Sequence, residues 1–309
     1  MDDDTVAEAG PVGSGPGWFD ELTPKPGPPW LSMGVHPLDL AAWLIVDDRY
    51  GEELALKRRL LDERHSEVFA ARAAGAAACE EVLELVVAWL AEHQPTLIAP
   101  DQGAGGSALH ATGGDVERMH PLDRAGRLVQ EDLCVLQAAE GAYRLEAASL
   151  CFPSHWRLAD KLGRSLAAIH APVPHYGDEL ETKVDLFFDR LHADRPVWRR
   201  NLSIHSHDDL FAPGPHEAPD CFAPDASGVN AVWLRSERQT LRRLPRTGAV
   251  LFTIKTQQCP LPTLAARPDL ARALASRLRS EQIEHRHTGA ALAFPPWLID
   301  WLEGVPQRR

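Results

Sequence analysis

The sequence lacks the features that mark several large classes of protein. It has no run of about 18 apolar residues, the length that a membrane-spanning helix requires. Its five cysteines form no CxxC pair or other zinc-type spacing, so we expect them to be small buried side chains. Acidic residues outnumber basic ones by 44 to 32, and a formal charge of −12 argues against nucleic acid or anionic lipid as a partner. The acidic opening has no basic segment of a secretory signal, which predicts a cytoplasmic protein.

Common catalytic and nucleotide-binding motifs are also missing. The glycines of residues 101–120 are not followed by GK[ST], so they do not predict a phosphate loop. The chain contains no GxSxG, no HExxH and no Cys/His pair at a known catalytic spacing. Iron–sulfur cysteine sets and a dinucleotide fingerprint are absent as well.

The remaining composition is that of a globular protein, with 309 residues of which 44% are hydrophobic and 25% charged. Residues 1–29 are rich in Pro, Gly and acidic residues, which predicts a flexible arm that Trp18, Phe19 and Trp30 could pin to the body. Residues 30–309 are interpreted as a single α+β domain.

Periodicity and turn residues predict both helices and strands. Two apolar runs at 133–139 and 142–150 flank Glu140-Gly141 and predict a β-hairpin. Further strands are expected at 231–236 and 249–256, with residues 239–244 between them. Helices are expected within 37–92, from Ser154 as an N-cap to Gly163, and at 165–170, 178–191, 264–280 and 295–302.

Four groups of residues could carry chemistry. His155 and His170 lie in one segment, and the prolines after His170 hold its backbone stiffly, although a single histidine is more often structural. Arg199 and Arg200 follow a tryptophan and could pair with carboxylates, or form a solvated basic patch. Glu237 at a strand end could handle a proton, or join an ion-pair network with its arginine neighbours. The fourth group comprises two HxH pairs, which could chelate a divalent ion: His205 with His207 and His285 with His287.

Taken in order along the chain, these segments resemble a known family. The stretches YRLEAASLCFPSHWRLADKLGRSLAAIHAPVPHY, FFDRLHADRPVWRRNLSI and LRSERQTLRRLPRTGAVLFTIKT resemble the haem-dependent oxidative N-demethylases, as do MGVHPLDLAAWLIVDDRY and LLDERHSEVFA nearer the amino terminus. The resemblance covers roughly residues 31–260. His36, Leu202, the HSHDD segment and the carboxy-terminal HRHTG segment depart from the pattern, which leaves the substrate more open than the haem.

The resemblance implies a PAS-like antiparallel sheet with surrounding helices that binds haem b. It implies a monooxygenase-type oxidation of a small amine by O₂, with electrons from a separate flavin and iron–sulfur reductase; a homo-oligomer stays open. His170 is the first candidate for the axial iron ligand, His155 the second and His205 the third. The resemblance also suggests Glu237 for the substrate ammonium or its proton. Candidates for the haem propionates are Arg199, Arg200 and Arg238.

Two other functions remain open at this point. A PAS-like fold that binds haem could serve as a sensing or storage module without turnover. A non-haem metal hydrolase could instead use the HxH histidines His205, His207, His285 and His287.

Overall fold

The computed structural model describes residues 15–22, 34–98, 119–170, 186–214, 222–288 and 294–306, and the side chains of 281–288 are left aside. Several expectations fall on other residues. Trp30, most of the glycine-rich stretch at 101–120, the prolines after His170 and the first part of the helix expected at 178–191 lie outside the described residues. The side chains of His285 and His287 do so too.

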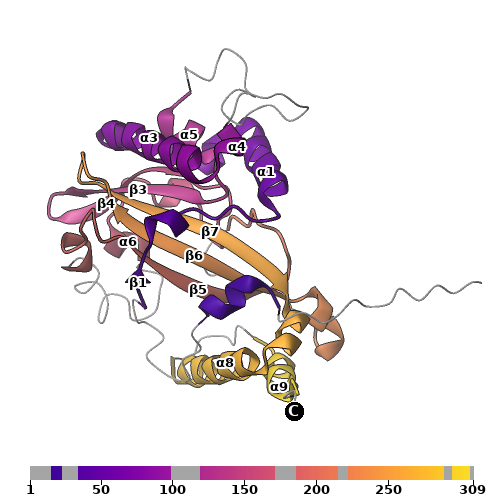
Figure 1. Ribbon diagram of the computed structural model, residues 1–309. Helices are drawn as coiled ribbons and strands as arrows, with labels where there is room; N and C mark the ends of the chain where they lie inside the picture. Colours follow the sequence, from indigo (N-terminus) through magenta and orange to yellow (C-terminus); the bar gives the residue numbers. More distant parts are fainter. Residues whose placement is uncertain are drawn as a thin grey trace, which may run out of the picture.

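A seven-stranded sheet organises the described chain, with strand order β1-β5-β6-β7-β3-β4-β2 (Figure 1). Neighbouring strands pair antiparallel throughout. Antiparallel strands combined with helices confirm the α+β class. The strands are β1 His36–Pro37, β2 Phe69–Ala71, β3 Asp132–Ala139, β4 Ala142–Ser149, β5 Val197–His205, β6 Trp233–Arg243 and β7 Val250–Pro260.

The hairpin predicted around Glu140-Gly141 is confirmed. β3 and β4 pair up to Ala139 and Ala142, and the two residues between them have positive φ, 54° at Glu140 and 80° at Gly141. Positive φ at both central positions is the backbone of a type I′ turn, whose twist matches that of the strands. Glycine adopts this conformation at no steric cost.

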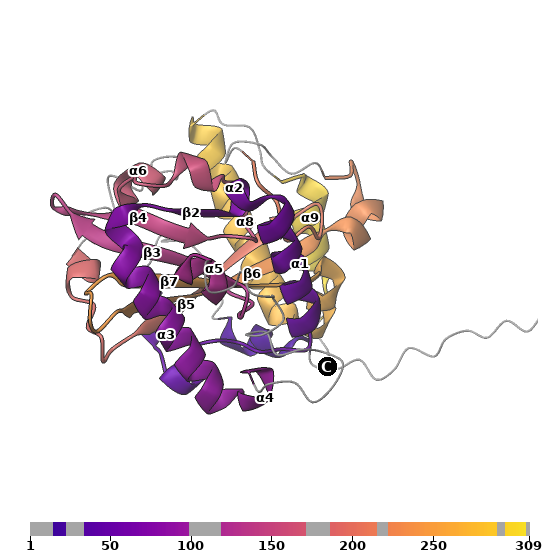
Figure 2. The ribbon, with the colours of Figure 1, turned by 90° about the horizontal axis from the view of Figure 1, so that it is seen from above.

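Helices lie on both sides of the sheet and at one end of it (Figures 1 and 2). None of those described is long and apolar enough to cross a bilayer. The α-helices are α1 Tyr50–Glu63, α2 His65–Val68, α3 Ala76–His93, α4 Pro95–Ile98, α5 Pro121–Gly126, α6 Leu166–His170, α8 Pro268–Thr288 and α9 Pro296–Gly304. Short 3₁₀ turns are η1 Gly17–Glu21, η2 Leu40–Ala42, η3 Ala73–Gly75, η5 Leu158–Asp160, η7 Ala226–Ala231 and η8 Leu261–Ala266.

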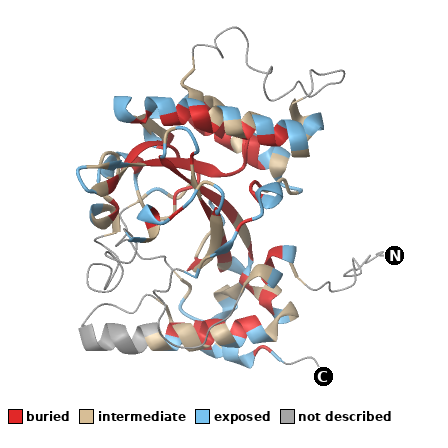
Figure 3. Cartoon of the chain, turned by 60° about the vertical axis from the view of Figure 1, so that its left-hand side comes forward, coloured by how far each residue is buried: buried red, intermediate tan, exposed pale blue. Residues whose placement is uncertain are grey.

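The two faces of the sheet bury different apolar sets. On the face that we call the α3 face, α3 and α5 pack against Leu133, Val135 and Leu251. The opposite face is called the α6 face. There Leu166 of α6 and the segment before α6 pack against the strand side chains that alternate with Leu133, Val135 and Leu251. Figure 3 shows that buried residues follow the strands and the inward sides of the helices.

A third apolar cluster joins the two ends of the chain. Trp18 and Phe19 of η1 are buried together with Leu234 of β6 and with α8 and α9. The T-shaped pair of Trp18 and Phe19, with ring centroids 4.7 Å apart, adds to this packing. Part of the amino-terminal arm is therefore anchored to the body by the aromatic residues that the sequence singles out.

Charged side chains are buried between α1 and the sheet. Lys255 of β7 is 1% exposed and lies 2.5 Å from Oε2 of Glu53 and 3.2 Å from Oδ2 of Asp47. Lys57, fully buried, donates to the carbonyl oxygens of Val129 and Glu131. Hydrogen bonds and opposite charges replace the water that a buried ion loses. The pair of Lys255 and Glu53 therefore fixes α1 to β7.

The structure corrects several sequence expectations. No helix starts at Ser154: this residue forms a β-bridge to Ala212, and His155 has φ 53°, which is incompatible with a helical first turn. β5 was not predicted, because polar side chains on both of its faces hide the alternation of a strand. Residues 239–243 do not separate two strands but continue β6. The short strand β2 interrupts the region expected to be helical.

Candidate functional site

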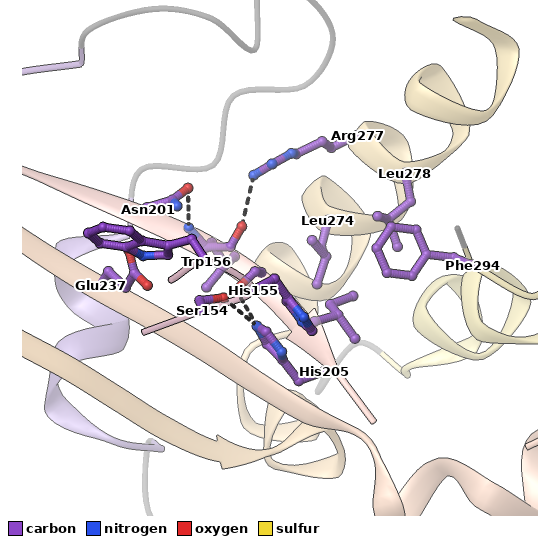
Figure 4. Close-up of a pocket in the computed structure, with 13 residues that line it drawn as sticks. Ser154, His155, Trp156, Asn201, His205, Glu237, Leu274, Arg277, Leu278 and Phe294 are labelled. Atoms are coloured by element: carbon purple, nitrogen blue, oxygen red, sulfur yellow. Dashed lines mark hydrogen bonds between the residues drawn. The ribbon is translucent and has the colours of Figure 1, made fainter. Parts of the chain in front are cut away.

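A cavity of about 310 Å³ lies along the carboxyl-terminal half of β5, between Glu237 of β6, the segment of His155 and α8 (Figure 4). This volume lies at the low end of the range for small-molecule sites. Trp156 and Glu237 lie at one end of the view, and Leu278 and Phe294 at the other. The lining residues are Ser154, His155, Trp156, Asn201, Leu202, Ser203, Ile204, His205, Glu237, Leu274, Arg277, Leu278 and Phe294.

The segment that carries Ser154 and His155 is held in place by backbone bonds. The amide of His155 donates to the carbonyl of Ala212 at 2.9 Å, and the amide of Ala212 donates to that of Pro153 at 3.2 Å. Arg235, fully buried on β6, supports the same region by donating to the carbonyls of Phe152 (2.6 Å) and Leu210 (3.4 Å). The positive φ of His155 is a strained conformation for a non-glycine residue, and such residues cluster at functional sites.

Glu237 projects into the cavity from β6. It is paired with Asn201 of β5, so both side chains lie on the α6 face. Its carboxylate accepts a hydrogen bond from Gln239 at 3.1 Å and lies 3.6 Å from Nε of Arg235. With 14% of its side chain exposed, Glu237 is a mostly buried carboxylate that can still meet a ligand. The sequence predicted Glu237 at the end of a strand, whereas it lies within β6 because that strand continues to Arg243.

Arg199 lies on the same face, two residues before Asn201. Burial lowers its pKa, the Glu237 carboxylate opposes this, and the positive charge of Arg277 lowers the pKa further. Its Nε atom is buried and has no hydrogen-bond partner among the described residues. A buried guanidinium nitrogen without a partner carries a desolvation penalty that an anionic ligand would relieve.

His170 ends the described part of α6. Its Nδ1 lies 2.9 Å from the carbonyl oxygen of Leu166, and because a carbonyl only accepts, Nδ1 carries the proton. The neutral ring then has its lone pair on Nε2. Burial lowers the pKa of His170, the bond to Leu166 raises it, and the charges of Lys161 and Arg199 lower it. His170 is thus a half-buried imidazole held in one orientation, and the charge of Arg199 is near enough to act on it, although His170 does not line the cavity.

Arg200 and Arg238 lie on the α3 face, away from the cavity. Arg200 bonds Glu21 at 2.8 Å, and it also donates to Ser236 and Gln257. Arg238 donates to the carbonyls of Ala42 and Trp43 at 2.8 and 3.1 Å. The structure therefore separates these two candidates from Glu237, Arg199 and His170.

Three histidines meet at one end of the cavity. One ring nitrogen of each of His155, His205 and His207 lies within 4.8 Å of the others. The rings of His155 and His205 stack, with centroids 5.1 Å apart and planes at 4° (Figure 4). The HxH spacing predicts that His205 and His207 lie close together. Their proximity to His155 depends on the fold.

Other residues of the site were not predicted. Trp156, Asn201 and Arg277 line the cavity, and Arg277 donates to the Leu202 carbonyl at 3.4 Å. Trp156 is next to His155 in the sequence, and Asn201 directly follows Arg199 and Arg200. Both residues therefore belong to stretches that the sequence singled out, although neither was given a role. Arg277 lies on α8, far from any motif, and carried no signal.

Comparison with known protein families identifies a match over most of the chain. The family model described as "Haem-dependent oxidative N-demethylase, alpha subunit-like" matches residues 34–286. The matched range is most of the chain and includes the strands, α6 and the cavity-lining residues except Phe294.

Proposed function

The chain belongs to the haem-dependent oxidative N-demethylase, alpha subunit-like family, and we propose that it binds haem b on the α6 face and oxidises a small amine. The PAS-like character of the sheet belongs to this proposal. So do the cytoplasmic location and the separate flavin and iron–sulfur reductase that supplies electrons. The observation that carries the proposal is His170, a half-buried imidazole whose Nδ1 bonds the Leu166 carbonyl and on which the charge of Arg199 acts.

The residues of the α6 face fit a haem group in three respects. Ile169, Trp156 and Val197 pack with the apolar cluster of this face and would contact a macrocycle. His170 offers a nitrogen ligand, and Arg199 offers a buried cation for a carboxylate. Haem needs this combination of apolar walls, an axial ligand and cationic partners for its propionates.

His170 is proposed as the residue that would hold the haem iron, through Nε2. Histidines that bind a metal almost always donate their other ring N–H to a carbonyl, carboxylate or water, which fixes the tautomer. The bond from Nδ1 of His170 to Leu166 is of this type. The lowered pKa of His170 favours the neutral form, which is the form that can bind iron. His155 and His205 stay secondary candidates for this role.

Arg199 is proposed as the partner of a haem propionate. Its position two residues from Asn201 on β5 puts it on the α6 face, whereas Arg200 and Arg238 lie on the opposite face. Arg200 and Arg238, the other candidates, already bond Glu21 and the η2 carbonyls. The geometry therefore favours Arg199.

Glu237 is proposed to bind the ammonium group of the substrate and to take up or return its proton. Its carboxylate is held by Gln239 and Arg235, so it is oriented before a ligand arrives. A mostly buried carboxylate interacts with a cation more strongly than one in water. Trp156, which lies beside Glu237 in Figure 4, would limit water at this point and offer a ring face to an alkylammonium.

The cofactor would supply the activation of oxygen and the electron transfer. The overall reaction balances as an N-methylamine, O₂, two electrons and two protons giving the demethylated amine, formaldehyde and water. The described residues would bind and orient the amine and hold one of its protons on Glu237. The electrons must come from outside the chain, because its sequence has no flavin or iron–sulfur motif.

The test is release of formaldehyde from dimethylamine by the haem-loaded protein with a chemical reductant and O₂. We expect formaldehyde to form only when protein, reductant and oxygen are all present. Tetramethylammonium should give none, because it has no N–H proton for Glu237. Haem binding with no formaldehyde from dimethylamine or other small N-methylamines would favour a sensing or storage module. No haem binding at all would refute the proposal.

A further inference from the structure

We propose that His155, His205 and His207 form a binding site for one divalent transition-metal ion of the zinc class, separate from the haem. Their ring nitrogens lie within 4.8 Å of one another at the edge of the cavity. None of the roles proposed for His170, Arg199 and Glu237 uses this cluster as a metal site. The inference therefore stands independently of the proposed function.

The fold brings the three rings together from two segments. His205 is the last residue of β5, and His207 lies two residues further on. His155 comes from the bridge segment, where its amide bonds Ala212 and its φ of 53° turns the chain. The buried Arg235 bonds both Phe152 and Leu210, so one side chain supports the segments on either side of the cluster.

The spacing suits a metal once the His155 ring turns out of its stacked position. Zinc binds histidine nitrogen at about 2.0–2.1 Å, so two nitrogens of a tetrahedral site lie about 3.4 Å apart. An ion lies in the plane of each imidazole that binds it, and the rings of His155 and His205 are parallel, at 4°. Turning the half-buried His155 ring about its Cβ–Cγ bond brings its plane toward the other two. The His207 ring is already at 68° to His205.

The neighbours of the cluster act as ligand-positioning groups. Ser203 Oγ lies 2.9 Å from Nε2 of His205, and the buried position of His205 keeps that ring in place. The Asp209 amide donates to Nδ1 of His207 at 3.2 Å, and the Asp209 carboxylate lies 3.6 Å from the same nitrogen. On binding a metal through Nε2, His207 would exchange the bond from the amide for one from Nδ1–H to this carboxylate. Hydroxyl and carboxylate partners of this kind orient metal-binding histidines and raise their basicity.

The donor set indicates the class of metal. Three imidazoles favour zinc, copper, nickel or iron over magnesium or calcium, which prefer oxygen ligands. Three protein ligands on zinc leave a fourth position for water or a small ligand. Because His155 and His205 line the cavity, that position would be supplied from the same space that Glu237 borders.

The test is equilibrium dialysis of the full haem-free chain with Zn²⁺ at neutral pH, with the metal counted by atomic emission. We expect one ion per chain in the wild type. His155→Ala and His207→Gln should each lower the affinity by about 100-fold, and Ser203→Ala by about tenfold. His192→Ala, which changes an exposed histidine outside the cluster, should bind like the wild type. Far-UV circular dichroism shows whether each variant folds, and His207 lies in a loop where replacement is tolerated best.

Two results would overturn the inference. The first is a wild-type chain that binds no Zn²⁺, Co²⁺ or Ni²⁺, or variants His155→Ala and His207→Gln that bind as the wild type does. The second is a haem spectrum that is lost in His155→Ala and kept in His170→Ala, which would make the cluster the haem ligand instead. Failure of demethylation with intact zinc binding would affect the proposed function alone.

Discussion

Arg199 and Arg200 are consecutive residues of β5, and their guanidinium groups lie on opposite faces of the sheet. Arg199 is on the cavity face, where its charge acts on His170 and on Glu237. Arg200 bonds Glu21 and lies 5.7 Å above the ring of Trp18. Because strand side chains alternate between faces, one sequence motif thus contains a residue for the site and a residue for the fold.

This relationship predicts different effects of two matched substitutions. Arg199→Gln should weaken haem binding by about 10- to 100-fold, the loss expected when one charged hydrogen bond of about 1.5–3 kcal/mol is removed. Arg200→Gln should leave haem affinity near that of the wild type and lower the urea midpoint, because Glu21 loses its partner. Haem titration followed by absorbance measures both affinities. Equal losses, or a larger one in Arg200→Gln, would contradict the assignment of the propionate partner.

Glu237→Gln separates binding of the cofactor from chemistry. The amide has nearly the shape of the carboxylate but cannot hold the charge of an ammonium or accept its proton. We expect the variant to bind haem with unchanged affinity and to release formaldehyde at least about 100-fold more slowly, within the usual range for a lost general base. Gln239→Ala, which removes only a hydrogen bond to the carboxylate, should cost far less. Demethylation at the wild-type rate in Glu237→Gln would exclude the catalytic role.

The sequence predicted the parts of the fold that follow local rules. Glu140-Gly141 supplied a recognisable turn, and α8 and α9 showed apolar helical patterns. The bridge segment at Ser154 could not be predicted, because its conformation depends on Ala212, far away in the chain. β5 was missed for a related reason: its polar side chains are buried by partners that only the fold provides.

The candidate site was predicted residue by residue but not as an arrangement. His155, His170, Arg199 and Glu237 were all selected from motifs. The sequence could not show that Arg238 would bond the carbonyl of Ala42, because 196 residues separate the two. The strand register that puts Arg238 and Glu237 on opposite faces requires knowing that both belong to β6.

The buried charges beneath α1 predict a large effect on stability. Lys255→Met leaves Glu53 buried without its ammonium partner, and breaking a buried pair costs about 3–5 kcal/mol. The double variant Lys255→Met, Glu53→Leu removes both charges and should recover much of that loss. Urea unfolding measures the free energy of each form. A single variant as stable as the wild type, or a double variant no more stable than the single variant, would contradict this account.

A pH dependence follows from His120, whose Nδ1 accepts the Leu122 amide at 3.2 Å and caps α5. Burial lowers the pKa of His120, against an opposing effect of Asp123. Its contribution to stability is therefore complete above the unfolded pKa, about 6.5, and is lost as the pH falls toward the folded value. His120→Asn keeps an acceptor at the cap but does not titrate. Between about pH 7.5 and about pH 5.5, the urea concentration at the unfolding midpoint should fall by less in the variant than in the wild type. An equal fall in both proteins would refute the role of His120 in the pH dependence.

The absorption spectrum of haem-supplemented His170→Ala, beside the wild type and His192→Ala, tests the central claim most directly. The structure holds the half-buried His170 ring in the tautomer with Nδ1–H on the Leu166 carbonyl, which leaves Nε2 as the nitrogen that would bind iron. We expect a Soret band at one haem per chain in the wild type and in His192→Ala, and its loss in His170→Ala, with imidazole added to the solution restoring part of it. A His170→Ala protein that binds haem with the wild-type spectrum, oxidised and reduced, would contradict the claim.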